Sequence, residues 1–173
     1  SSTTASAAVG DTYGGGVVAY ILASGDPGYD ANQQNGLIAA LTGQTSSAKW
    51  SWKTQIPGAD GTAIGTGAQN TIDILTACAT SGTAAYICAN LVIDVYSDWF
   101  LPSKDELKLM YDNIGQGNVL GLGNVGVFDN AAYYSSSENP NDGNQAWIVY
   151  FNKNKQVTDD KGNNMSARAV RAF

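Results

Sequence analysis

The chain has 173 residues, of which 43% are hydrophobic and 14% are charged, so it has enough apolar material for one domain with its own core. The net charge of −6 argues against nucleic-acid binding, because contacts with phosphates need a basic surface. The absence of histidine excludes Ser-His-Asp and Cys-His catalysis and histidine-ligated metals. A carboxylate-pair hydrolase or a lysine nucleophile stays open on this ground. We nevertheless expect a protein that is not an enzyme and that holds no metal.

The first residues are rich in serine, threonine and alanine, which predicts a linker or disordered segment over residues 1–12. A single domain is expected over residues 13–173. The chain begins without a methionine or a signal peptide, and we expect it to be part of a longer protein. It has no run of ~18 apolar residues, so we expect no direct insertion into a membrane.

Two short apolar runs near the N-terminus predict buried strands. The first covers residues 17–22 and follows three glycines, and the second covers residues 36–41. Residues 26–29 (DPGY) between them are a turn signal. Farther along, Trp50 and Trp52 form an alternating aromatic pair.

Helical signals begin in the middle of the chain. Asn70 is a suitable N-cap for a helix over residues 71–78, and Ile72, Leu75 and the following Ala79 would then share one face. A second, shorter helix is expected in the apolar stretch that follows residue 82.

The two cysteines, Cys78 and Cys88, fall near the junction of these helices. We expect them to form a disulfide that closes a small loop, since such a bond stabilises a domain in an oxidising compartment. The alternative is a pair of buried thiols. Two cysteines without histidine make a poor zinc site.

The clearest helix start is at Ser103. Glu106 lies three residues later and completes a capping box, and Asp105 adds negative charge at the positive end of the helix dipole. Gly115 or Gly117 is expected to end this helix. Residues 115–130 are rich in glycine and asparagine and predict a long loop.

The C-terminal part predicts strands. Residues 146–151 alternate, with Trp147, Val149 and Phe151 on a face that we expect to be buried. The opposite face offers Ile148 and Tyr150. These two side chains either pack under a loop or form the apolar centre of a binding surface.

A polar connection is expected over residues 152–166, followed by a final strand over residues 167–173. Strands at both ends with two or three helices between them predict an α+β fold with an antiparallel sheet and long loops. The two terminal strands could pair in one sheet.

The charge is distributed unevenly. Residues 1–150 carry four basic and 13 acidic side chains, whereas residues 151–173 carry five basic and two acidic ones. The basic end is either a solvated strip or a patch that attracts an anionic partner. We expect its lysines to be exposed and at least one arginine to pair with a carboxylate. The residues concerned are Lys153, Lys155, Lys161, Arg168 and Arg171, with Asp98 and Glu138 as the candidate carboxylates.

Two runs are rich in oxygen ligands. Residues 159–164 (DDKGNN) and the group of Glu138, Asn139 and Asn141 could in principle surround a calcium ion. The match to an EF-hand loop is poor, because Lys161 interrupts the first run. We therefore expect no cofactor.

Several short sequence motifs occur in a fixed order, and together they resemble the DUF1566 family, also called the Lcl C-terminal domain family. They are GGVV (15–18), GDPGY (25–29), GLIAA (36–40), GTAIGTG (61–67), YSDWFLPSKDEL (96–107), YYSSSE (133–138), AW (146–147) and RAVRAF (168–173). The resemblance covers about residues 13–173. It implies a C-type-lectin-like fold in the branch of formylglycine-generating enzymes, and a bacterial or phage surface module. The founding adhesin domain of the family binds sulfated glycosaminoglycans.

The C-terminal segment also resembles the variable proteins of diversity-generating retroelements, in which diversified positions interleave with scaffold residues. Residues 138–166 hold seven of the 15 asparagines of the chain. Amide side chains both donate and accept hydrogen bonds, which suits sugar hydroxyls and peptide groups alike. Each asparagine alone is equally typical of a turn or a solvated loop. The candidate ligand-binding residues are Asn139, Asn141, Asp142, Asn144, Gln145, Ile148, Tyr150, Asn152, Asn154, Gln156, Thr158, Asn163 and Asn164.

The leading hypothesis is a ligand- or receptor-binding module of a bacterial or phage surface protein, with its binding face on residues 138–166. The partner would be a protein receptor or a glycan on a cell surface. One alternative is an adhesin domain that binds glycosaminoglycan-like glycans through the basic strip. A further alternative is a structural oligomerisation or tail-tip domain, such as a homotrimer. All three imply an extracellular, cell-surface or virion-surface location.

Overall fold

The computed structural model describes residues 6–173. Residues 1–5 of the expected linker lie outside the described residues. The rest of that segment packs against the domain, since Ala7 N donates to Gln34 Oε1 at 2.8 Å and Gly10 N donates to Val18 O at 2.8 Å. Among residues 6–173, no helix combines the length and the apolar character needed to cross a membrane.

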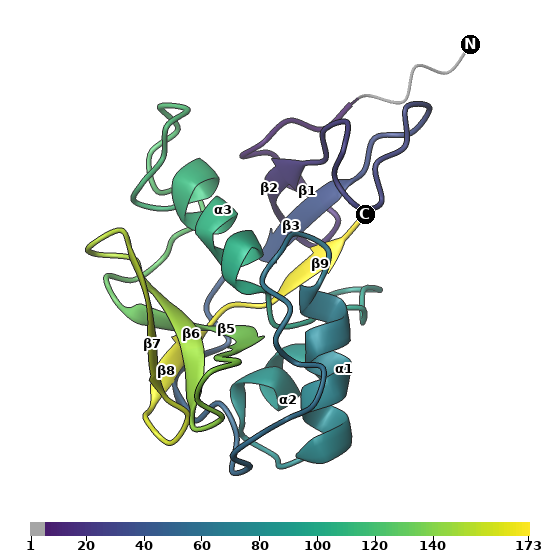
Figure 1. Ribbon diagram of the computed structural model, residues 1–173. Helices are drawn as coiled ribbons and strands as arrows, with labels where there is room; N and C mark the ends of the chain where they lie inside the picture. The colour runs from purple at the N-terminus through teal and green to yellow at the C-terminus, as the bar shows by residue number, and fades with distance from the viewer. Residues whose placement is uncertain (1–5) are drawn as a thin grey trace.

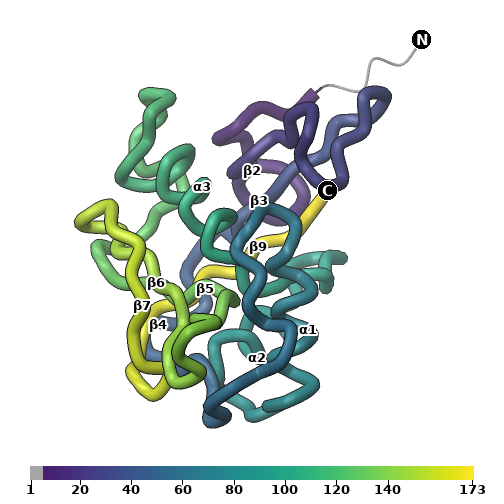
Figure 2. Tube along the Cα trace, in the orientation of Figure 1, coloured from purple at the N-terminus to yellow at the C-terminus, as the bar shows by residue number. Residues whose placement is uncertain are grey.

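The two ends of the domain meet in one antiparallel sheet. Its strands are β1 (Thr12–Tyr13), β2 (Gly16–Ile21), β3 (Gly36–Ala40) and β9 (Val170–Ala172), in the order β1-β2-β3-β9. Figure 2 shows β9 beside β3 at the C-terminal end of the chain. The expected strands over residues 17–22 and 36–41 are confirmed, and both ends of the domain contribute to one sheet, as expected. The single final strand expected over residues 167–173 is wrong in part, because β9 covers only Val170–Ala172 and residues 165–167 belong to a strand of the second sheet.

A second sheet carries most of the C-terminal half. It consists of β4 (Thr45–Ala48), β5 (Ala132–Glu138), β6 (Gln145–Tyr150), β7 (Lys155–Asp160) and β8 (Met165–Ala167), in the order β4-β8-β5-β6-β7. The pairing of β5 with β8 is parallel and the other pairings are antiparallel. Together with the helices, the two sheets confirm the α+β class.

Strand β7 corrects the expectation of a polar connection over residues 152–166. Its sequence, KQVTDD, shows little strand preference, but all six residues pair with β6 in continuous register. Pairing with a strong neighbouring strand therefore decides the structure here rather than local propensity.

Three helices cover this second sheet: α1 (Gly67–Ala77), α2 (Ala84–Ala89) and α3 (Lys104–Ile114). The capping box of α3 is confirmed, because Ser103 N donates to Glu106 Oε2 at 2.7 Å and Glu106 N donates to Ser103 Oγ at 3.3 Å. Figure 1 shows α3 apart from α1 and α2, with the strands between them. The long connection after α3 is also confirmed.

Helix α1 begins earlier than expected. Its N-cap is Thr66 rather than Asn70, whose side-chain amide donates to Gly61 O at 2.6 Å from within the helix. This contact makes Asn70 a buried anchor between α1 and the preceding loop. The buried face carries Ile74, while Ile72 is 56% exposed, so the expected apolar face is wrong.

Both faces of strand β6 are buried, because helices pack on each side of the sheet. Val149 and Phe151 belong to a core cluster with Met110 of α3, as expected for that face. Ile148 is fully buried in the other cluster, with residues of α1 and α2. Trp147 is only half-buried and lies under the Lys104 ammonium, 4.1 Å from the ring centroid. The expected burial therefore holds for Val149 and Phe151 and is wrong for Trp147, and of the two alternatives for Ile148 the structure shows the packed one.

Both cysteines are free, buried thiols, in contrast to the disulfide that we expected. Cys78 Sγ lies 3.4 Å from Thr80 Oγ1, and Cys88 is enclosed in the core on α2. Burial alone raises a thiol pKa, as it does for Cys88. At Cys78 this effect is outweighed by hydrogen bonds with Thr80, Ser51 and the Trp52 backbone, which lower the pKa to about 7.

Candidate ligand-binding surface

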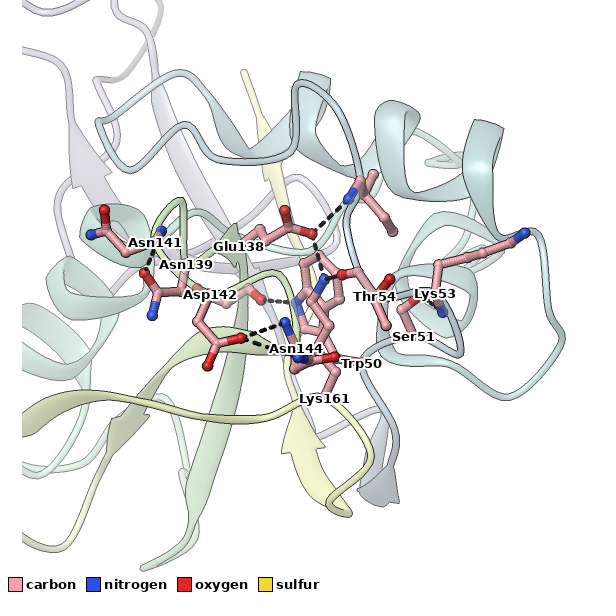
Figure 3. Close-up of polar contacts among 12 residues, drawn as sticks. Trp50, Ser51, Lys53, Thr54, Glu138, Asn139, Asn141, Asp142, Asn144 and Lys161 are labelled. Carbon is pink, nitrogen blue, oxygen red and sulfur yellow. Dashed lines mark hydrogen bonds and ion pairs between the residues drawn. The ribbon is translucent and has the colours of Figure 1, made fainter.

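Three connections meet at one end of the second sheet. They are residues 51–55, which follow β4, residues 139–144 between β5 and β6, and residues 162–164 between β7 and β8. We call them together the loop surface. Gly143 lies so close to Gln55 that a Cβ at this position would be 3.1 Å from the Gln55 Cβ, so the first two connections are in contact. Figure 3 shows polar side chains of these two connections together with Glu138 and Lys161.

A buried ion pair lies beneath the loop surface. The side chains of Lys161 and Glu138 are each 4% exposed, and Lys161 Nζ donates to Glu138 Oε2 and to the Thr54 carbonyl (Figure 3). Glu138 Oε2 also accepts from Ile56 N at 2.8 Å. The ammonium lies 4.4 Å from the centroid of the Trp50 ring. One ion pair thus joins all three connections.

Lys161 was expected to be exposed, and its burial is a correction. Burial lowers the pKa of the Lys161 ammonium, while the Glu138 carboxylate and Asp142 act in the opposite direction. Main-chain bonds fix the same place, since Trp50 N donates to Lys161 O at 3.0 Å and Lys161 N donates to Asn144 O at 2.9 Å. The Trp50 indole itself donates to Ser135 O at 2.7 Å. The support of the loop surface is therefore rigid.

The connection between β5 and β6 is held by its own side chains. Asn141 N donates to Asn139 Oδ1 at 3.0 Å, and Asn144 N donates to Asp142 Oδ1 at 3.0 Å. These are Asx turns, in which a short side chain accepts from the backbone two residues on. Asn139 and Asp142 thus shape the loop, whereas Asn141 and Asn144 are exposed.

The connection between β7 and β8 is built in the same way. Asp160 Oδ1 accepts from Gly162 N at 2.7 Å, and Asp159 Oδ1 accepts from Asn163 Nδ2 at 2.8 Å. The Tyr134 hydroxyl donates to Asp160 O and Asn163 O, and burial raises its pKa. The carboxylates of the proposed calcium run therefore serve the turn. Residues 6–173 contain no group of three or more acidic or cysteine side chains that could hold a metal ion.

Trp52 is a residue of this site that sequence reasoning did not assign to binding. Its side chain is 62% exposed, and the Lys49 ammonium lies 4.0 Å from its ring centroid. Beside it is a cavity of about 200 Å³ lined by residues of all three connections. The available signal was the pair of nearby tryptophans, of which Trp50 is buried and Trp52 is exposed.

Comparison with known protein families gives a match over residues 31–171, to the model described as the Lcl C-terminal domain. The chain belongs to the Lcl C-terminal domain family. A search of curated proteins finds no match for this Lcl domain. Among solved structures, a fimbrial protein from Bacteroides ovatus ATCC 8483 matches with a TM-score of 0.53 and 16% identity. The match covers 78% of the Lcl domain and 35% of the fimbrial protein, so the likeness concerns the fold of about a third of that protein.

Three other candidate residues of the Lcl domain, Gln145, Gln156 and Thr158, lie on strands β6 and β7. Thr158 Oγ1 and Asn139 Nδ2 both donate to Gln145 Oε1, at 2.7 and 3.1 Å. Gln156 Nε2 donates to Lys104 O at 3.4 Å, which ties β7 to the start of α3. These amides are already engaged within the protein.

Asn152 and Asn154 lie at the opposite end of the β6–β7 hairpin from the loop surface (Figure 1). Tyr150 is half-buried, with the Lys153 ammonium 5.2 Å from its ring centroid. Ile148 is fully buried, so its assignment to a ligand-binding surface is wrong. The residues of the expected binding face, 138–166, thus lie in three places: the loop surface, the part of the sheet that carries Gln145 and Thr158, and the tip of the β6–β7 hairpin. Only the first two adjoin each other.

The basic strip is not one continuous surface. Arg168 is buried and donates to three main-chain carbonyl oxygens at 2.7 to 2.9 Å. Arg171 forms a two-pronged ion pair with Asp98, at 2.6 and 2.9 Å, so the expected arginine–carboxylate pair is found there. Lys153 and Lys155 remain exposed near the hairpin tip. Three of the five basic residues of the strip therefore bind groups within the Lcl domain itself, namely Lys161, Arg168 and Arg171.

Proposed function

We propose that this domain is a non-catalytic recognition module with a C-type-lectin-like fold, and that its loop surface binds a receptor protein or a glycan on a cell surface. The proposal rests on one observation at this end of the sheet, namely that exposed polar side chains lie directly on a buried, tightly bonded support. Asn141, Asn144, Asn163 and Asn164 are exposed there, directly above a buried ion pair and a fully buried tryptophan.

The physical argument is preorganisation. Binding costs less when the side chains of a site are already held by a rigid support, because less conformational freedom is lost. The Asx turns and the Lys161–Glu138 pair supply this support. Exposed amides offer both donors and acceptors, which match polar partners such as hydroxyl groups and peptide groups.

Membership of the Lcl C-terminal domain family and the fold shared with a fimbrial protein support a location on a bacterial or virion surface. The basic strip receives less support as a binding site, because Lys161, Arg168 and Arg171 have partners within the domain. The loop surface is therefore the stronger candidate.

The proposal includes diversification of the loop surface. Exposed asparagines alternate in the sequence with buried scaffold residues such as Ala146 and Lys161, so their side chains can change without loss of the core. Sequencing of the neighbouring DNA tests this part. A near-copy of the segment that encodes residues 134–171, next to a reverse transcriptase gene, is the expected result, and its absence contradicts diversification.

The binding function is tested on a printed array of neutral, sialylated and sulfated glycans and of receptor ectodomains. The wild type should give a signal that is lost in the variant with Asn141, Asn144 and Asn163 replaced by alanine. The matched control replaces Asn152 and Asn154, which lie at the other end of the hairpin, and should keep the signal. Equal loss in both variants, or retention in both, would contradict the assignment of the loop surface.

A further inference from the structure

Trp52 breaks the usual rule that a tryptophan side chain is largely buried. It is 62% exposed, whereas Trp50, two residues earlier, is fully buried. The Lys49 ammonium lies 4.0 Å from the Trp52 ring centroid. An ammonium at this distance is attracted by the ring and favours one orientation of the indole. The indole is therefore a flat apolar surface presented to solvent next to the cavity of the loop surface.

The cavity itself is polar and small. Its volume is about 200 Å³, and Thr54, Asn144, Asp160 and Gly162 line it together with Trp52. Asn144 and Asp160 are both exposed, and they bring an amide and a carboxylate to the side of the indole. The site thus combines one aromatic wall with hydrogen-bonding groups of both kinds.

The charges around the cavity nearly balance. Lys161 also lines the cavity, and its buried ammonium is engaged by Glu138 and the Thr54 carbonyl. The remaining charged groups near the cavity are two lysines and two aspartates, namely Lys49, Lys53, Asp142 and Asp160. The arrangement favours a ligand without net charge.

We propose that the cavity binds an uncharged pyranose ring, with the apolar C–H face of the sugar on the Trp52 indole and its hydroxyl groups on Asn144 and Asp160. A pyranose carries an apolar face and a rim of hydroxyls, and the cavity offers the complement of both. This inference rests on the proposed recognition function and names the ligand class of the same surface. The proposed sugar site also includes residues 49–54, which lie outside residues 138–166, the binding face expected from the sequence.

The test uses the indole N–H signals in nitrogen-15 NMR spectra of the whole domain. The Trp52 signal is assigned with Trp52→Phe. Methyl α-D-mannopyranoside, methyl β-D-galactopyranoside and methyl α-D-glucopyranoside are then titrated separately. At least one should shift the Trp52 signal saturably, with a dissociation constant on the order of 1 mM, as expected for a single small ring. Saturation transfer should label the C–H protons of one sugar face most strongly.

Trp52→Ala should weaken binding of that glycoside roughly tenfold or more, since a contacting tryptophan usually dominates a small interface. Trp147→Ala is the matched control, because this ring also carries a lysine ammonium, at 4.1 Å, but does not line the cavity. It should leave the affinity unchanged. Circular dichroism confirms that both variants are folded.

Two results would overturn the inference. The first is that none of the three glycosides shifts the Trp52 signal. The second is that a heparin hexasaccharide shifts it and added salt abolishes the effect, which would mark the ligand as anionic. If either occurs while the array signal still depends on Asn141, Asn144 and Asn163, the recognition surface stands and only the sugar assignment fails. If the array signal is also independent of them, both proposals fail.

Discussion

Replacing Lys161 with methionine removes the ammonium group that joins the three connections of the loop surface. The carboxylate of Glu138 then remains buried, with Ile56 N–H as a remaining donor. Loss of one partner of a buried ion pair costs about 3–5 kcal/mol, because the other charge is left uncompensated. Glu138→Gln leaves the Lys161 ammonium buried without a counter-charge and should cost a similar amount.

The double variant Lys161→Met/Glu138→Gln removes both charges and keeps an amide oxygen that can accept from Ile56 N. Its loss of stability should be smaller than the sum of the single losses by at least about 2 kcal/mol, which is the coupling expected for groups in direct contact. The free energy of unfolding is measured by urea titration followed by circular dichroism.

The surface pair of Lys108 and Asp112 on α3 provides the matched control. Its side chains are 27% and 30% exposed, and pairs of this kind contribute about 0–1 kcal/mol. Lys108→Met should therefore change the free energy of unfolding little. If Lys161→Met costs no more than Lys108→Met, the buried pair does not hold the loop surface together and the reasoning is refuted.

Three further predictions follow from burial and pKa. Ile148→Ala should lower the free energy of unfolding by about 2–5 kcal/mol, as for a core residue, and an unchanged urea midpoint would contradict its burial. Iodoacetamide should modify Cys78 before Cys88, with a rate that rises as pH passes about 7, because the thiolate reacts, and mass spectrometry after digestion identifies the modified residue. Arg171 lowers the pKa of Asp98, so this pair stabilises the fold above the ordinary carboxyl pKa, and its contribution is lost as the pH falls through the lowered value. Asp98→Asn should reduce the melting temperature at neutral pH, and the difference from wild type should vanish in acid.

Local signals in the sequence predicted local structure well. The helix start at Ser103 was readable because both partners of the capping box lie within one turn. The burial of Lys161 was not readable, because its partners lie 23 and 107 residues away in the chain. A lysine in a polar run is normally exposed, and only the closed fold shows that Glu138 and Thr54 surround it.

Strand β6 shows the limit of periodicity. Alternation predicts one buried and one exposed face, which holds when a sheet has one face in solvent. Here Ile148 and Val149 are both fully buried, because helices cover both faces of the sheet. Whether the second face is covered depends on α1 and α2, whose positions the local pattern does not contain.

The candidate site was predicted in part. Counting asparagines led to residues 139–144 and 163–164, which the structure places together at one end of the sheet. The same count included Asn152 and Asn154, which the hairpin carries to the other end. Trp52 was missed because it comes from a different part of the chain. Sequence proximity thus found two of the three connections that build the loop surface, and it missed the connection that carries Trp52.

The most direct test of the account is the affinity of the domain for the strongest array ligand, measured by isothermal titration calorimetry alongside the melting temperature. The variant with Asn141, Asn144 and Asn163 replaced by alanine should bind at least roughly tenfold more weakly, while its melting temperature stays close to that of the wild type. Undiminished affinity in this variant would show that the ligand binds elsewhere. A large fall in melting temperature would show that these side chains support the fold instead of contacting a partner.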